Sequence, residues 1–497
     1  MDELSRSLSA FRPELALLIG LALVVLADTF LGASRQFWTR LLTAASLAGA
    51  LGAALALAAS GTRATIFSGM LVIDPLGSAL ELILIASGLL TVLAFSFRNS
   101  RELHGLGQGE LYSLVLALVL SCLLLAAAGD VVMLYLALEM VSITSYVMVA
   151  YLKGDRLSNE ASLKYVLFGA ASTGSMLYGL SLLYGLSGTT SLRGIQEYLA
   201  GGIPDGNRFA VYAITLLVLA GFGFKIAAVP FHFWCPDVYQ GAATPVTALL
   251  SVLPKAAGLA IALRFFDGTF SVPGRHAWDL SGSIEWGGLL MLVSVLTMTL
   301  GNVAALTQTN MKRLLAYSSI AHAGFLLMGI VALSENGARG LIVYLGAYLF
   351  MNLGAFLVVT LVHLHTGSFD LRDYPGLHRR APLLTLAMAF FLLSLVGIPP
   401  FVGFLAKLYV FAAVIEQGSG IYATIAALNA AVAAYYYFKV LKVMTIDPGN
   451  EDQPAIELAL ADKAWLAAFA LANVVPLLFW DRIEGWARGA LVLYAGR

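Results

Sequence analysis

The sequence has little charge. Aspartate, glutamate, lysine and arginine make up 12% of its 497 residues, and 60% of the residues are hydrophobic. An ordinary soluble domain has roughly 25% charged residues, so a soluble globular protein is excluded. Basic and acidic residues balance to a net charge of zero, which argues against a nucleic-acid partner or a strongly basic membrane-surface face.

Cysteine and cofactor motifs are scarce too. The two cysteines, Cys122 and Cys235, both lie in apolar runs, which argues against a disulfide framework or a metal cluster. There is no CxxC set, no Walker loop and no GxGxxG between a strand and a helix. We read "GLGQGE" at 105–110 as a loop. The chain is therefore expected to bind no metal and no redox cofactor itself.

Long apolar runs fill the sequence instead. A bilayer core of about 30 Å requires roughly 20 apolar residues per helix, and the runs lack the alternation of a barrel strand. We expect an all-α integral membrane protein, a single membrane domain over 1–497 in which the N-terminal run is a retained helix. The expected spans, about fourteen, are 13–31, 39–59, 70–97, 110–127, 129–151, 160–186, 208–238, 244–266, 284–305, 311–332, 338–365, 380–417, 421–445 and 462–480.

Lysine and arginine in the connections predict the orientation. The odd-numbered connections, with "RNSR", "KGDR" and "MKR", carry most of them. The positive-inside rule places these connections in the cytoplasm. With an even number of spans, both termini are then expected outside.

Four ionisable residues lie deep inside the expected spans. A charge at mid-bilayer costs about 2.5 to 3.5 kcal/mol on insertion scales, so such residues indicate function. They are Glu139, Lys225, Lys255 and Lys407. A glutamate cannot reach the interface from this depth, so Glu139 is expected to have a buried cationic partner or a proton.

Other polar residues in the spans have a simpler alternative. Lys164, Lys439 and Lys442 lie near span ends, where a long side chain can reach the interface. His232 and His322 are candidate proton relays, although His232 also fits an aromatic packing cluster. His363 and His365 are expected at the interface, and Asp74 and Glu81 have no assigned role.

Prolines interrupt two of the spans. Pro230 follows Lys225 in "KIAAVPFHFW", and Pro399 and Pro400 precede Lys407 in "VGIPPFVGFLAK". Broken helices at membrane depth occur where backbone lines water or lies inside the protein. The two breaks lie five spans apart, which predicts two inverted five-helix repeats over 110–266 and 284–445.

Three motifs resemble those of a known family. "KIAAVPFHFWCPDVYQGAATPVTALLS", "ALTQTNMKRLLAYSSIAHAGF" and "GIPPFVGFLAK" are similar to the antiporter-like membrane subunits of respiratory complex I, of multisubunit sodium/proton antiporters and of membrane-bound hydrogenases. The resemblance covers residues 70 to 445. Lysine at 407 is typical of the N type, where the M type has glutamate, and no long lateral helix like that of the largest members follows the last span.

The resemblance implies roles for these residues. Glu139 would pair with Lys225, Lys255 would be the central relay and Lys407 would gate the exit. Lys164 would tune Glu139, and His232 and His322 would help hydrate the path. NADH, FMN, iron–sulfur clusters and quinone would belong to partner subunits, and an M-type subunit and small membrane subunits would be neighbours in a bacterial inner membrane. A sodium/proton antiporter subunit without redox partners remains the alternative, and a structural spacer is disfavoured by the buried charges.

Overall fold

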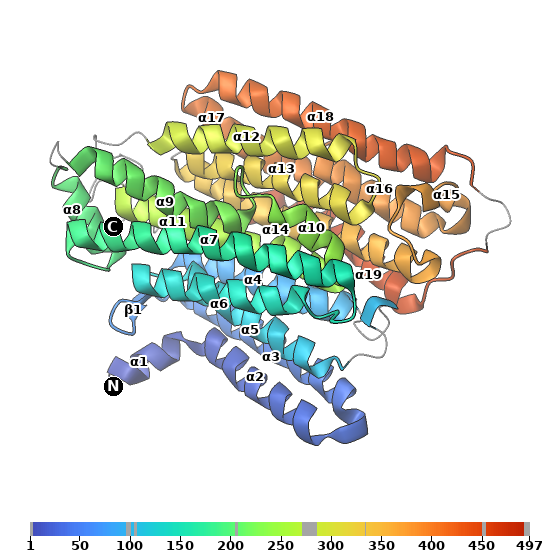
Figure 1. Ribbon diagram of the computed structural model, residues 1–497, viewed down its shortest axis with the longest axis horizontal. Helices are drawn as coiled ribbons and strands as arrows, with labels where there is room; N and C mark the ends of the chain where they lie inside the picture. Colours follow the sequence, from blue (N-terminus) through green and yellow to red (C-terminus); the bar gives the residue numbers. More distant parts are fainter. Residues whose placement is uncertain are drawn as a thin grey trace.

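The computed structural model describes residues 3–95, 101–103, 107–203, 207–270, 286–332, 334–449 and 454–491. Nearly all regular structure in these ranges is helical (Figure 1). The α-helices are α1 (Glu3–Ala10), α2 (Arg12–Phe30), α3 (Arg35–Ser60), α4 (Pro75–Ala94), α5 (Gly109–Ala126), α6 (Val131–Val149), α7 (Arg156–Ser187), α8 (Leu192–Ala200), α9 (Arg208–Ile226), α10 (Trp234–Gly241), α11 (Thr244–Phe270), α12 (Trp286–Leu306), α13 (Met311–Val331), α14 (Glu335–Thr366), α15 (Leu377–Arg380), α16 (Pro382–Val396), α17 (Val402–Glu416), α18 (Gly420–Thr445), α19 (Leu460–Ala472) and α20 (Trp480–Gly489).

The predicted membrane fold is confirmed. Twelve described helices are long and apolar enough to cross a bilayer, and a bent pair, Leu460–Ala472 with Val475–Gly489, would make a thirteenth. The expected span 380–417 is present as α16 and α17, each of 15 residues and so short for a bilayer alone. The expected span 70–97 is shorter than predicted, because its first residues form a small antiparallel hairpin, β1 (Ala64–Ile66) with β2 (Leu71–Ile73).

The helices lie side by side with their axes running along the length of the molecule (Figure 1). In that view α2 and α3 form one edge and α17 and α18 the opposite edge. Between them, α11, α13 and α14 are buried over almost their whole apolar length. A helix that is apolar on all sides packs in the protein interior. These three helices therefore form the core of the bundle, against which buried charged side chains pack.

Two connections share the same construction. Asp130 caps α6, and the backbone next to it forms a bridge with Ser191. Asn310 caps α13, and its backbone forms the corresponding bridge with Asp370. In both places a cap at the start of one helix is tied to the segment that follows the next long helix.

Asp74 and Arg264 join the N-terminal helices to the core. Asp74 caps α4 by accepting from the N–H of Gly77 at 2.7 Å. Both of its carboxylate oxygens also accept from Arg264 of α11, at 2.8 and 2.9 Å, and Arg264 Nε donates to the carbonyl of Ala126. The pair is almost completely buried. Asp74 therefore has a structural role that the sequence left unassigned.

Replacing Arg264 by methionine is expected to destabilise the helical bundle by about 3–5 kcal/mol, since a buried carboxylate would lose its partner. The double variant Asp74→Asn/Arg264→Met should recover a large part of that loss. Arg193→Met, which removes an exposed pair with Glu197, should change stability by less than about 1 kcal/mol. Thermal unfolding of the purified native assembly measures all three, and equal effects of Arg264→Met and Arg193→Met would contradict the assignment.

Candidate functional site

The first interruption separates α9 from α10. α9 ends at Ile226, directly after Lys225, and Ala227 takes a left-handed conformation with φ of 59°. The freed backbone groups find partners in neighbouring helices and side chains. The N–H of Val229 donates to Thr297 of α12 at 2.9 Å, and the Trp234 indole donates to the carbonyl of Phe224 at 3.0 Å. The break predicted at Pro230 is present: Ala227 and Val229 are buried, whereas Pro230 itself is exposed on the surface of this chain.

The second interruption separates α16 from α17. α16 ends at Val396 and Gly397 adopts φ of 87°. Lys407, on α17, returns to this end: its Nζ donates to the carbonyls of Leu395 and Val396 at 3.0 and 2.7 Å. A cation at a helix C-terminus is favoured because the last carbonyls carry partial negative charge. The order of lysine and proline differs between the two breaks. Lys225 lies in the last turn of the first half-helix, whereas Lys407 lies on the second half-helix and its ammonium reaches the last carbonyls of the first.

Gly397 is expected to control the position of Lys407. A Cβ at Gly397 would lie 2.8 Å from Lys407 Cδ, in a left-handed conformation. Gly397→Ala should therefore combine backbone strain of about 1–2 kcal/mol with displacement of the ammonium. Gly418→Ala is the matched control, because Gly418 also has positive φ, 77°, but open space around it. An activity that depends on Lys407 should fall in Gly397→Ala and stay normal in Gly418→Ala; equal activity in both would show that the glycine does not position the lysine.

Lys225 lies beside Glu139 without a direct ion pair. It is fully buried and donates to Ser142 Oγ of α6 at 2.9 Å. Glu139 is less than one turn earlier on α6, half-buried, and near enough for its charge to act on Lys225. The expected pairing is thus replaced here by a pairing with Ser142. Lys225 also packs on Gly258 of α11, where an added Cβ would lie 3.0 Å from its Cγ.

Lys255 is the centre of a polar cluster in the core. Its Nζ donates to Ser319 Oγ of α13 at 2.5 Å. The same hydroxyl accepts from Tyr348 at 2.7 Å and lies 3.2 Å from the Tyr239 hydroxyl. Pro254 precedes Lys255 and has no N–H to give to the helix. Side chains from α10, α11, α13 and α14 therefore meet around one buried lysine.

His322 continues this cluster towards Lys407. It lies one turn beyond Ser319 on α13, with its ring nitrogens 2.8 Å from the Tyr344 hydroxyl and 3.3 Å from the Tyr437 hydroxyl. Phe325, one further turn along α13, lies under the Lys407 ammonium at 4.7 Å. The predicted residues Lys255, His322 and Lys407 are thus arranged along α13.

The remaining candidates lie outside this row. His232 is buried in the first break, where its Nδ1 has no hydrogen-bond partner within the described part of the chain. Because residues 227–233 are not helical, His232 and Lys225 do not lie on one helix face. Lys164 is partly exposed and binds Glu160 and Asp237, each at 2.7 Å, rather than Glu139.

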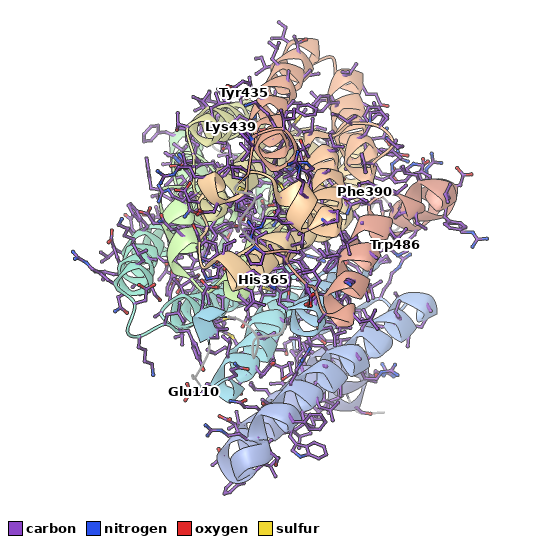
Figure 2. The ribbon with its side chains drawn as sticks, turned by 90° about the vertical axis from the view of Figure 1, so that its right-hand side faces the viewer. Glu110, His365, Phe390, Tyr435, Lys439 and Trp486 are labelled. Atoms are coloured by element: carbon purple, nitrogen blue, oxygen red, sulfur yellow. The ribbon has the colours of Figure 1, made fainter. Side chains whose placement is uncertain are left out.

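The interfacial residues are found near helix ends. Lys442 is exposed and pairs with Asp447 at 2.8 Å. Lys439 is near Tyr435 on the end face of the bundle in Figure 2, and its Nζ reaches the carbonyl of Leu306 at 3.4 Å. His365 lies in the last turn of α14, as expected, and is labelled on the same face.

Several residues of the site cannot be recognised from the sequence alone. Ser319 and the tyrosines at 239, 344, 348 and 437 are ordinary in composition, and only their contacts reveal them. The charge pattern places Lys312 in a connection, but its side chain is fully buried and pairs with Glu102 at 3.3 Å. Among the described residues, no group of three His, Cys, Asp or Glu side chains could hold a metal ion.

Comparison with known proteins identifies the family. The model of the family described as "NADH:quinone oxidoreductase/Mrp antiporter, TM" matches residues 128–432, more than half of the chain. The chain belongs to this family. The matched region contains both broken helices and the residues Glu139, Lys225, Lys255 and Lys407.

Curated relatives indicate which type of subunit within the family the chain resembles. The NADH-quinone oxidoreductase subunit N of Anaeromyxobacter sp. (strain Fw109-5) is 43% identical over 100% of this chain and 99% of its own length. The NAD(P)H-quinone oxidoreductase subunit 2 of Synechococcus sp. (strain JA-3-3Ab) is 42% identical over 89% of this chain and 81% of its own length. The resemblance to the N type is confirmed.

Solved structures share the fold. A chain of respiratory complex I from Thermus thermophilus with bound Aureothin is 30% identical, covers 94% of this chain and 98% of its own length, and superposes with a TM-score of 0.75. A chain of the Mrp complex from Dietzia sp. DQ12-45-1b has a TM-score of 0.83, with coverage of 99% and 98%, at 19% identity. The latter similarity concerns the fold alone.

Proposed function

We propose that this chain translocates protons across the membrane as a subunit of NADH:quinone oxidoreductase. The observation that carries the proposal is the row of buried lysines, Lys225, Lys255 and Lys407, with Ser319 and His322 between the last two. A protein with only a structural role would gain stability by losing these charges. The names of the relatives support the redox complex as its setting.

Proton movement follows from charge changes along this row. A carboxylate near a buried ammonium stabilises it, and burial without a partner favours loss of the proton. When Glu139 approaches Lys225, that lysine keeps its proton; when they separate, the proton is easier to pass to Lys255. Hydroxyl groups of Ser319 and the tyrosines, with water in the breaks, would connect Lys255 through His322 to Lys407, which releases the proton on the opposite side.

The energy needed is within reach of such a rearrangement. Moving one charge against about 150 mV costs roughly 3.5 kcal/mol, at about 2.3 kcal/mol per 100 mV. Breaking or forming one buried ion pair changes the free energy by a similar amount, about 3–5 kcal/mol. A conformational signal from a partner subunit that moves Glu139 relative to Lys225 is therefore sufficient to move one proton.

A partner subunit is expected against α6. Glu139 is half-buried in this chain, and α6 also exposes the large apolar residues Leu136, Met140 and Ile143. A carboxylate on a lipid-facing surface is costly, so an antiporter-like neighbour such as an M-type subunit would cover it. NADH, FMN, iron–sulfur clusters and quinone would be held by other subunits of the same complex.

The two-repeat organisation and the orientation also belong to this proposal. The bridges that tie Asp130 to Ser191 and Asn310 to Asp370 occupy matching places in 110–266 and 284–445, of which 204–206, 284, 285 and 333 lie outside the described residues. Each range also contains one broken helix. The repeats would be inverted, with the odd-numbered connections in the cytoplasm and both termini outside the inner membrane.

A sodium/proton antiporter subunit without redox partners is the second candidate, because an Mrp chain shares the fold. Purification of the native assembly in mild detergent separates the two. Co-purification with flavin and iron–sulfur subunits, together with NADH-dependent proton pumping, is expected. Isolation with other membrane subunits only, and sodium/proton exchange without NADH, would overturn the redox assignment.

A further inference from the structure

One end of the bundle contains a pocket of about 710 Å³. It is formed by connections and helix ends that contribute residues 102, 107, 110, 151–155, 157, 240, 241, 310, 363 and 369. Glu110 lines the pocket, and His365 lies two residues after the lining residue His363. Both Glu110 and His365 are labelled on the end face seen in Figure 2. The connections are odd-numbered ones, so the pocket opens on the side where the proposed function needs proton uptake. Its ionisable lining residues are Glu102, Glu110, Tyr151, Lys153, Asp155 and His363.

Glu102 borders this pocket and is bonded to the core. One carboxylate oxygen accepts from the N–H of Thr244, the first residue of α11, at 2.7 Å. The other lies 3.3 Å from Lys312 Nζ. Burial raises the pKa of the Glu102 carboxyl, but the Lys312 ammonium, the Thr244 N–H and the His363 charge together hold it below its ordinary value. The resting form of Glu102 at neutral pH is therefore the carboxylate.

Lys312 closes the route behind Glu102. Its side chain is fully buried, its Nζ donates to the carbonyl of Ala242 at 2.5 Å, and it lies 4.6 Å from the centre of the Phe369 ring. Apart from Glu102, the charged group that acts on it is Asp155. The pair thus bridges α13 and the junction between α10 and α11, where an open path to the core would begin.

The same face of α13 leads onward from Lys312. Ser319 lies seven residues later, two helical turns along one side, and is the residue that holds Lys255. Thr244 begins the helix that carries Lys255. Both partners of the Glu102–Lys312 pair are therefore attached to elements that reach the central lysine.

We propose that the Glu102–Lys312 ion pair is the gate of the proton inlet to Lys255. Glu102 takes a proton from water in the pocket, and its neutralisation releases Lys312. The opening at Ala242 and Thr244 then lets water carry the proton to the neutral amine of Lys255, and Glu102 returns to its charged form. This inference rests on the proposed proton translocation and assigns Glu102 as the acceptor and Lys312 as the residue that positions it.

The test is the rate of NADH-driven proton uptake by inverted membrane vesicles, per assembled complex, as a function of external pH. Glu102→Gln should lower the rate about tenfold or more at every pH, since the proton acceptor is lost. In Lys312→Met, no ammonium offsets the burial of the Glu102 carboxyl, so the pKa of Glu102 should rise. Glu102 would then keep its proton at the lower pH, and pumping should fall several-fold as pH drops from 8 to 6. Lys312→Arg keeps the pair and should restore a pH profile like that of the unchanged protein.

Other outcomes decide against the gate. Normal rates and an unchanged pH profile in both Glu102→Gln and Lys312→Met would overturn it, as would a loss of assembly with normal pumping per assembled complex. If Lys312→Met does not assemble, Glu102→Asp keeps both charges but withdraws the carboxylate from Lys312, and unchanged pumping there would overturn the gate. Normal pumping in Lys255→Met would instead contradict the proposed function itself, which separates the two failures.

Discussion

Replacing Lys255 by methionine is expected to abolish proton pumping while leaving the complex assembled. Methionine has nearly the length of the lysine stem and no charge, so it fits a buried site without the cost of an unpaired ammonium. Ser319 would lose the lysine but keep its contact with Tyr348 at 2.7 Å. Pumping should fall by about a hundredfold or more, the scale on which positioned proton carriers act.

The matched control for Lys255→Met is Lys442→Met. Lys442 is exposed at a helix end and pairs with Asp447, so its loss should leave both assembly and pumping unchanged. NADH-driven acidification of inverted vesicles, normalised to the amount of assembled complex, measures both variants. Equal pumping by the two would remove Lys255 from the proton path.

The second large effect is expected at Lys407. Lys407 Nζ donates to the carbonyls of Leu395 and Val396. Substitutions at this position can therefore distinguish a role in hydrogen bonding from a role in carrying protons. Lys407→Gln can still donate to these carbonyls but cannot carry a proton, so it should assemble and fail to pump. Lys407→Glu, held neutral against the carbonyls, can donate and also titrate, and should retain part of the activity.

Lys407→Ala completes that series. It leaves two carbonyls at the end of α16 without their donor, at about 1–3 kcal/mol for each unsatisfied group. The expected order of pumping per assembled complex is therefore lysine, glutamate, then glutamine and alanine together. A glutamine variant that pumps as well as the unchanged protein would show that Lys407 only satisfies the backbone. Equal losses in the glutamate and alanine variants would count against a relay.

The membrane fold was predictable because it depends on the composition of long apolar runs and not on individual contacts. Each of the fourteen expected apolar runs corresponds to a helix, a broken helix or a bent pair. Pro230 and the Pro399–Pro400 pair marked the two breaks, since proline removes a backbone donor wherever it occurs. The hairpin at Ala64–Ile73 was not predicted, because three-residue strands have too few residues to show a period.

The site was predictable where a residue type is costly in a membrane. Lys225, Lys255 and Lys407 are conspicuous for that reason. Ser319 is not, because serine is common in membrane helices and only its contact with Lys255 gives it a role. Lys312 is the second residue of α13, so its position in the sequence predicts a connection. Its complete burial depends on contacts with Glu102, Ala242 and Phe369, which belong to other segments of the chain.

Pairing across helices was the least predictable feature. The expected Glu139–Lys225 contact requires two helices to take one relative position, and in this structure Lys225 turns to Ser142 instead. The same displacement by less than one helical turn, from Ser142 to Glu139, is the change that the proposed mechanism uses.

The most direct test of proton transfer through the buried lysines is the number of protons translocated per NADH oxidised by the assembled complex carrying Lys225→Met, reconstituted in sealed vesicles. The lysine row predicts that this number falls, or that NADH oxidation itself stops because electron transfer cannot proceed without proton movement. An unchanged proton number at a normal rate of NADH oxidation would show that protons do not pass through these lysines.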